Sequence, residues 1–142
     1  MLEVNPKHSN TLYNYAVLLD THLKRLPEAE SLYRRTLEME PRHAYALYNL
    51  AVLLEDKCFN ISDKYPNVTD EEIETGKQEA LQLYKRAVDA DPKDATTMAD
   101  YARYMLMRLE DATKAEPIFV AALKLDPSCE VAMFHYGLLL HK

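Results

Sequence analysis

The chain has 142 residues and a formal net charge of −6, with 48% hydrophobic and 28% charged residues. This composition is typical of an ordered soluble protein that can bury a core. The acidic balance disfavours nucleic acids and anionic membranes as partners, because both require a basic surface. There is no run of 18 or more apolar residues, so no membrane-spanning helix is predicted.

Four prolines mark a repeat along the chain. They occur as Asn5-Pro6, Glu40-Pro41, Asp91-Pro92 and Asp126-Pro127, with spacings of 35, 51 and 35 residues. The segment 11–20 (TLYNYAVLLD) returns as 46–55 (ALYNLAVLLE), with seven of ten positions identical. Self-similarity at a period of 20–50 residues predicts a stacked-repeat architecture.

The first helix of each repeat is predicted from apolar residues at i, i+3, i+4 and i+7. The predicted segments are 9–23, 44–57, 94–108 and 129–141. Their apolar stripes are Leu12, Tyr15, Ala16 and Leu19; Leu47, Leu50, Ala51 and Leu54; Met98, Tyr101, Ala102 and Met105; Met133, Tyr136, Gly137 and Leu140. Each stripe has a small residue at the same place, which we expect to allow the close approach of a neighbouring helix.

The second helices are predicted at 28–40, 70–90 and 112–125, each followed by one of the prolines. They share a small residue, an aromatic one four later, and a small one three beyond that. These sets are Ala29, Tyr33 and Thr36; Ala80, Tyr84 and Ala87; Ala115, Phe119 and Ala122.

Two irregularities interrupt the pattern. The second repeat is 17 residues longer than a standard unit, which predicts an insertion near 57–73 with a turn at 65–67. Thr69 and Glu72 form a capping-box pattern, so we expect a helix to start near Asp70, although Gly76 lowers its helix propensity. Pro117 predicts either a kink or a delayed start of the helix that contains it.

The small–aromatic–small–proline register, found three times, resembles the tetratricopeptide repeat. The resemblance covers nearly the whole chain as repeats at about 9–42, 44–93 and 95–128, with a partial repeat at 130–142. Two features depart from the family pattern: no tryptophan is present, and the turn between the paired helices lacks its glycine. The family implies an all-α, right-handed superhelix of antiparallel helix pairs, with about seven helices here.

Both ends of the sequence resemble interrupted repeats, so we expect a fragment of a longer array. Residues 2–6 (LEVNP) match residues 37–41 (LEMEP), and residues 137–142 stop one helix into a repeat. No secretory signal pattern is present at the start. Two cysteines are too few for a disulfide framework, which favours a reducing compartment and a cytoplasmic location.

The sequence contains none of the familiar patterns of catalysis. It has no glycine-rich phosphate loop, no His-Glu-x-x-His, no Cys-x-x-Cys and no Gly-x-Ser-x-Gly. The acidic run at 70–74 lacks the ligand spacing of a calcium loop and is interpreted as a solvated helix start. We therefore expect neither an enzyme nor a bound metal or cofactor.

The resemblance implies that the first helices line a concave groove that binds a peptide segment or a partner helix. The candidate groove residues lie one or two positions off the apolar stripe. They are Asn10, Tyr13, Asn14, Val17, Tyr45, Tyr48, Asn49, Val52, Asp100, Arg103, Phe134 and His135. An asparagine amide carries both a donor and an acceptor, so repeated asparagines could hold an extended peptide backbone. The alternative is that these tyrosines and asparagines bridge neighbouring helices.

A second hypothesis is that the chain is a self-association module. The segment 130–141 carries Met133, Tyr136, Leu139 and Leu140, and we expect a second copy to cover this apolar patch in a homodimer. Binding of chaperone C-terminal tails is disfavoured. Of the five clamp positions implied by the family (Lys, Asn, Asn, Lys and Arg), only Asn49 matches, while Tyr13, Val17, Thr96 and Asp100 differ.

Overall fold

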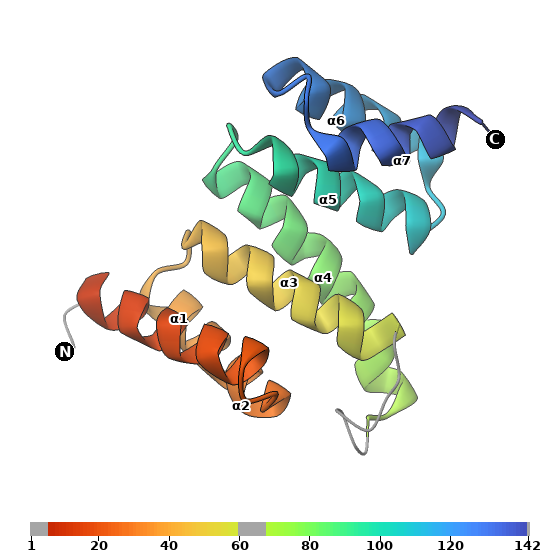
Figure 1. Ribbon diagram of the computed structural model, residues 1–142. Coiled ribbons are helices and arrows are strands. Elements are labelled where there is room, and N and C mark those ends of the chain that lie inside the picture. The colour runs from red at the N-terminus through yellow and green to blue at the C-terminus, as the bar shows by residue number, and fades with distance from the viewer. Residues whose placement is uncertain (1–5, 60–67, 142) are drawn as a thin grey trace. The chain divides into compact units, whose positions relative to one another are not determined.

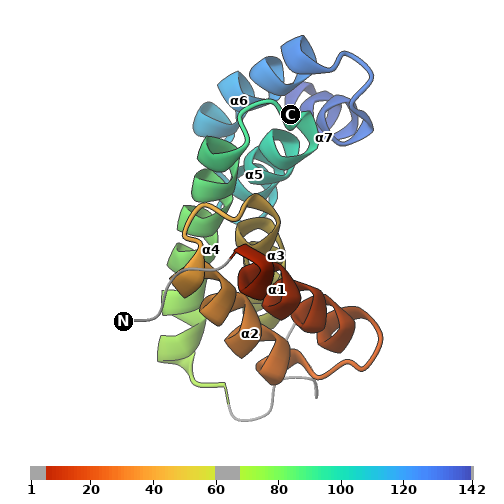
Figure 2. The same cartoon turned by 90° about the vertical axis from the view of Figure 1, so that its left-hand side faces the viewer.

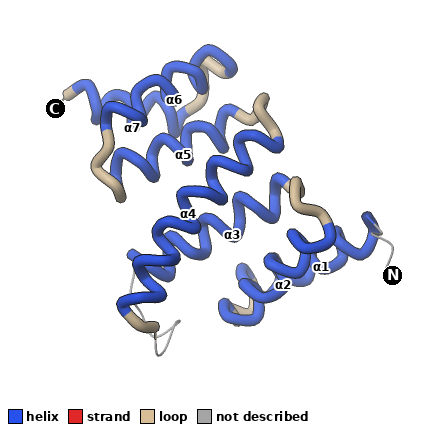
Figure 3. The backbone as a smooth tube through the Cα atoms, turned by 180° about the vertical axis from the view of Figure 1, so that it is seen from behind, coloured by secondary structure: helices blue, strands red, loops and turns tan. Residues whose placement is uncertain are grey.

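The computed structural model describes residues 6–59 and 68–141 (Figure 1). In these two ranges the chain forms seven α-helices and no strand (Figure 3). The helices are α1 (Pro6–Thr21), α2 (Leu26–Met39), α3 (Ala44–Phe59), α4 (Asp70–Ala90), α5 (Ala95–Met107), α6 (Ala112–Leu125) and α7 (Glu130–Leu140). The predicted all-α array of helices is confirmed.

The chain divides into two units, residues 1–83 and 84–142, with the boundary inside α4. In the first unit α1 packs against α2, and α2 packs against α3 (Figure 2). In the second unit α5 packs against α6, and α7 packs against both of them. The pairs α1/α2 and α5/α6 thus each lie beside the first helix of the next repeat, as the repeat pattern predicts.

The turn after each second helix has the same form in all three repeats. The helices α2, α4 and α6 end one residue before an acidic residue, which is followed by proline. In each turn a backbone N–H donates to the carbonyl of that acidic residue at 3.0–3.2 Å. The three bonds are His43 to Glu40, Asp94 to Asp91, and Cys129 to Asp126. Because proline cannot continue the helix, the chain reverses at the same place each time.

In the turn between the two helices of a pair, a residue other than glycine takes up the left-handed backbone conformation. Lys24 and Glu110 take up the left-handed backbone conformation, with φ of 55° and 54°. Both turns are closed by equivalent backbone bonds, from Arg25 N to Leu19 O at 2.8 Å and from Asp111 N to Met105 O at 2.9 Å. A left-handed residue other than glycine costs about 1–2 kcal/mol, which the surrounding helix pair must offset.

The apolar stripe of a first helix faces two different neighbours. In α1, Ala16 and Leu19 are buried, but Tyr15 is 51% exposed, so the expected core role of Tyr15 is wrong. The equivalent tyrosine in α7, Tyr136, stacks 6.2 Å from Phe119 of the preceding second helix. This position therefore belongs to the contact with the preceding helix pair, and no described helix precedes α1.

The helix that follows the insertion starts where the cap pattern predicts. α4 begins at Asp70, and the Thr69 hydroxyl accepts a hydrogen bond from the Glu72 backbone N–H at 3.2 Å. The predicted turn at 65–67 and most of the insertion lie outside the described residues. A delayed helix start at Pro117 is wrong, because α6 begins at Ala112 and contains this proline.

Gly76 has a packing role that cannot be inferred from its low helix propensity. It is buried in α4, and a Cβ atom added there would lie 2.5 Å from the Sγ atom of Cys58 in α3. The absence of a side chain therefore lets these two helices approach closely. Gly76 thus has a packing role in addition to the lower helix propensity that the sequence indicates.

We predict that Gly76→Ala lowers the free energy of unfolding, although alanine is the better helix former by about 1 kcal/mol. The added methyl must displace the Cys58 side chain, and overpacking of this kind costs about 1–3 kcal/mol. Chemical denaturation measures the change. The double variant Gly76→Ala/Cys58→Ala should recover stability, because it removes the clash and keeps the better helix former.

The matched control is Gly137→Ala in α7, where an added Cβ atom meets nothing within 4 Å. There the helix propensity acts alone, so stability should rise by up to about 1 kcal/mol. If both alanine variants moved stability in the same direction, the contact between Gly76 and Cys58 would not be the deciding interaction.

Candidate functional site

The candidate groove residues of α1 and α3 are joined to each other by polar contacts. The Asn49 side-chain amide donates a hydrogen bond to the Tyr13 hydroxyl at 3.0 Å. At the start of α3, the His43 Nε2 atom lies 3.1 Å from the Asn10 Oδ1 atom. Both contacts cross from the first helix of one repeat to the first helix of the next. For Asn49 and Tyr13 the structure therefore favours the bridging alternative.

His43, which the sequence analysis did not select, organises this surface. Its Nδ1 atom accepts a hydrogen bond from the Ala46 backbone N–H at 3.1 Å, so the imidazole caps the N-terminus of α3. With Nδ1 accepting, Nε2 carries the proton and donates to Asn10. The repeat register could have indicated this role, because the equivalent residue Asp94 caps α5 through Thr97.

Four rings gather around these contacts. The Tyr13 ring lies 4.9 Å from His43 and 6.2 Å from both Tyr33 and Tyr45, measured between ring centroids. Burial raises the pKa of the Tyr13 hydroxyl, and it also raises the pKa of Tyr33, whose hydroxyl donates to Asp20 at 3.1 Å. Both phenols therefore stay neutral at physiological pH. Tyr45 forms the outer edge of the cluster and is 67% exposed.

The other candidates of the first unit differ in their access to solvent. Asn14 is exposed on α1, and Val52 is exposed on α3. Val17, Tyr48 and Asn49 are half-buried. Among the candidate groove residues of this unit, Tyr45, Asn14 and Val52 are therefore exposed, as is Asn10, which contacts His43.

The candidates of the second unit are placed differently. Asp100 is buried and forms an ion pair with Arg103, one turn later, at 3.5 Å. Arg103 also donates to the Tyr84 hydroxyl at 3.3 Å. The Nδ1 atom of His135 lies 2.9 Å from the Val131 carbonyl of its own helix, whereas Phe134 is 64% exposed. The repeated position occupied by Asn14, Asn49, Asp100 and His135 thus has a different polar environment in each repeat.

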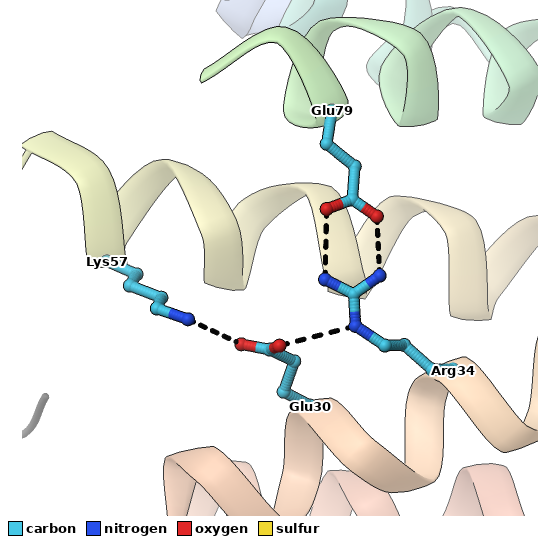
Figure 4. Close-up of polar contacts among 4 residues, drawn as sticks. All are labelled: Glu30, Arg34, Lys57 and Glu79. Carbon is cyan, nitrogen blue, oxygen red and sulfur yellow. Dashed lines mark hydrogen bonds and ion pairs between the residues drawn. The ribbon is translucent and has the colours of Figure 1, made fainter. Parts of the chain in front are cut away.

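The first unit also contains a cleft of about 640 Å³ between α2, α3 and α4. Figure 4 shows the charge network on its wall, in which Arg34 of α2 forms two parallel hydrogen bonds with Glu79 of α4. Glu30 accepts from Arg34 at 3.2 Å and from Lys57 of α3 at 3.1 Å. Hydrogen bonding to Glu79 raises the pKa of Arg34 further, so its charge is permanent.

This network ties three helices together. A bidentate arginine–carboxylate pair fixes geometry as well as charge, so it holds the middle of α4 against α2. The described residues contain no group of three or more metal-ligating side chains that could bind an ion. The cleft lies next to the insertion, because Thr69, Glu71 and Glu72 are among the residues that line it.

Comparison with known proteins agrees with this architecture. Residues 23–57 match the family model of the tetratricopeptide repeat. The tetratricopeptide domain of Arabidopsis OM64 superposes with a TM-score of 0.72 at 17% identity, covering 94% of both chains. The Sgt2 tetratricopeptide domain from Aspergillus fumigatus gives 0.70 at 14% identity, covering 96% of this chain and 79% of that one.

An O-GlcNAc transferase mutant from Thermobaculum terrenum also matches, with a TM-score of 0.70 at 20% identity. That match covers 99% of this chain but only 24% of the transferase. No curated protein matches this chain significantly in sequence. None of the described helices is long and apolar enough to cross a membrane.

These findings confirm the class of protein that the sequence pattern indicated. The fold is an all-α solenoid of the tetratricopeptide type, and residues 23–57 match the tetratricopeptide repeat family. Such a fold is in general a scaffold for protein–protein interaction.

We predict that His43→Ala lowers the free energy of unfolding by about 1–2 kcal/mol, because it removes the cap of α3 and the contact with Asn10. Thermal or urea denaturation measures the loss. His43→Asn should retain most of the stability, since asparagine is a strong N-cap residue. Equal losses for the two variants would show that capping is not the role of this side chain.

Proposed function

We propose that the chain is a non-enzymatic scaffold that holds a peptide segment or a partner helix against its first helices. The observation that supports this proposal best is that Tyr45, Asn14 and Val52 are exposed on two first helices that hydrogen bonds join to each other. Exposed aromatic rings on a rigid base are effective contact residues, because little conformational entropy is lost when they bind.

The partner in this proposal is a protein, and nucleic acids and membranes are disfavoured by the net charge of −6. Neither a cofactor nor a metal takes part. Cys58 and Cys129 are buried free thiols, which suits a reducing compartment such as the cytoplasm. The repeats at 9–42, 44–93, 95–128 and 130–142 would each contribute a first helix to this scaffold.

The test is a selection of binders from a random peptide library displayed on phage, followed by affinity measurement. For an isolated peptide we expect a Kd of about 1 μM. Asn14→Ala and Tyr45→Ala should each weaken binding about fivefold, equivalent to about 1 kcal/mol, and leave unfolding unchanged. Asn49→Ala should reduce stability as well, because it breaks the contact with Tyr13.

Two results would contradict the proposal. The selection could yield no binder, or the selected peptides could bind the Asn14→Ala and Tyr45→Ala variants as tightly as the parent chain. Arg35→Ala, an exposed substitution on the second helix α2, is the control and should leave peptide affinity unchanged.

The second candidate function is self-association. It is favoured by the exposed apolar side chains of α7, among them Phe134 and Leu140. In this reading the chain forms a homodimer through α7, and light scattering should show a mass near twice 16.4 kDa. If the chain remained a monomer at all accessible concentrations, self-association through α7 would be excluded.

A further inference from the structure

The contacts between α1 and α3 fix the direction of their hydrogen bonds. Because the His43 Nδ1 atom accepts from the Ala46 backbone N–H at 3.1 Å, the imidazole proton is on Nε2. The Nε2 atom donates to the Asn10 Oδ1 atom, 3.1 Å away, so the amide oxygen of Asn10 is used inside the fold. Asn10 is exposed, and within residues 6–59 and 68–141 no group accepts a hydrogen bond from its amide nitrogen.

The Tyr13 hydroxyl is directed in the same way. Its oxygen accepts from the Asn49 amide at 3.0 Å. Burial raises the pKa of this phenol, so it keeps its own proton at neutral pH. In the part of the chain that the structure describes, no group accepts that proton. Tyr13 and Asn10 are three residues apart on α1 and share one face of this helix, which therefore presents two neighbouring hydrogen-bond donors.

An exposed aromatic ring lies beside these donors. Tyr45 is 67% exposed, and its ring centroid lies 6.2 Å from that of Tyr13 and 6.5 Å from that of His43. We call Asn10, Tyr13, His43 and Tyr45 the donor surface. Its two acceptor atoms at this contact, His43 Nδ1 and Asn10 Oδ1, are both occupied within the fold.

The donor surface favours a ligand with free carbonyl groups. An α-helix uses its backbone carbonyls in internal hydrogen bonds, except in its last turn. A polyproline II segment has no internal hydrogen bonds, so all its carbonyls are available, and each proline lacks an N–H that would compete with the donors. Aromatic side chains are also the usual partners of proline rings in peptide recognition. Of the two ligands named in the proposed function, the extended peptide therefore fits better than the helix.

We propose that the donor surface binds a proline-rich segment of a partner protein in the polyproline II conformation. The Asn10 amide and the Tyr13 hydroxyl donate to carbonyls of the segment, and a proline ring packs on Tyr45. Little conformational entropy is lost, because the segment is largely extended before it binds. This inference rests on the proposed function, since it names the class of peptide that the first helices hold.

The probe is a synthetic peptide of four Pro-Pro-Leu units between single lysines, acetylated and amidated at its ends. Its counterpart has alanine in place of every proline, which restores the backbone N–H groups and permits a helix. Calorimetric titration of the intact chain measures both affinities at pH 8, where an ordinary imidazole is neutral. We expect saturable binding of the proline peptide, and binding of the alanine peptide that is weaker by about tenfold or more.

The sharpest variant is Asn10→Asp, which replaces the free amide nitrogen by an oxygen and keeps the oxygen that accepts from His43. It should weaken binding of the proline peptide by about tenfold and leave thermal unfolding nearly unchanged. The added negative charge attracts the lysines of the probe, so charge alone would change the affinity in the opposite direction. Arg35→Ala, at an exposed position of α2, changes the net charge by the same amount and should leave the affinity unchanged.

Two results of these titrations would overturn the inference. The proline peptide could bind no better than the alanine peptide, or it could bind the Asn10→Asp variant as tightly as the parent chain. The library selection described above separates this failure from that of the proposed function. Selected peptides that lack proline would overturn the polyproline inference alone, whereas a selection without any binder would overturn both.

Discussion

The packing of small residues around one aromatic ring in each second helix is the constraint on which this structure depends. In α2, Ala29, Tyr33 and Thr36 are all fully buried, and in α6 the same holds for Ala115, Phe119 and Ala122. A ring between two small residues lets paired helices approach closely, and a larger neighbour would separate them. Because a pair buries only part of its apolar surface, its other face requires the next repeat. Stability is thus built from one neighbour to the next along the chain.

The features that could be predicted from the sequence are the ones that local chemistry determines. The predicted limits of α4 and α6 agree with the structure, because a capping threonine, a capping aspartate and the prolines set those ends. The small–aromatic–small register predicted the buried face of each second helix, since a helical period of 3.6 residues determines which side chains share a face. Both features depend only on residues that are close together in the sequence.

The features that could not be predicted depend on residues far apart in the chain. Tyr15 and Tyr136 occupy equivalent positions, but within residues 6–59 and 68–141 only Tyr136 has a preceding second helix to pack against. The role of Gly76 depends on Cys58, 18 positions earlier across the insertion. Asn49 and Tyr13 are both typical surface residues by pattern, and their hydrogen bond joins positions 36 apart. A repeat pattern identifies equivalent positions, but each repeat has its own neighbours.

This difference between repeats bears on how the groove would recognise a ligand. A regular asparagine ladder, holding any extended backbone, requires the same amide to face the ligand in every repeat. Here Asn49 donates to Tyr13, Asp100 pairs with Arg103, and His135 contacts the carbonyl of its own helix. The repeated position therefore contributes mainly to the internal order of each unit. Under the proposed function, contact with a ligand in the first unit would rest on exposed side chains such as Tyr45. An aromatic ring requires a complementary group at one place, so such a surface would select the side chains of its partner and not only an extended backbone.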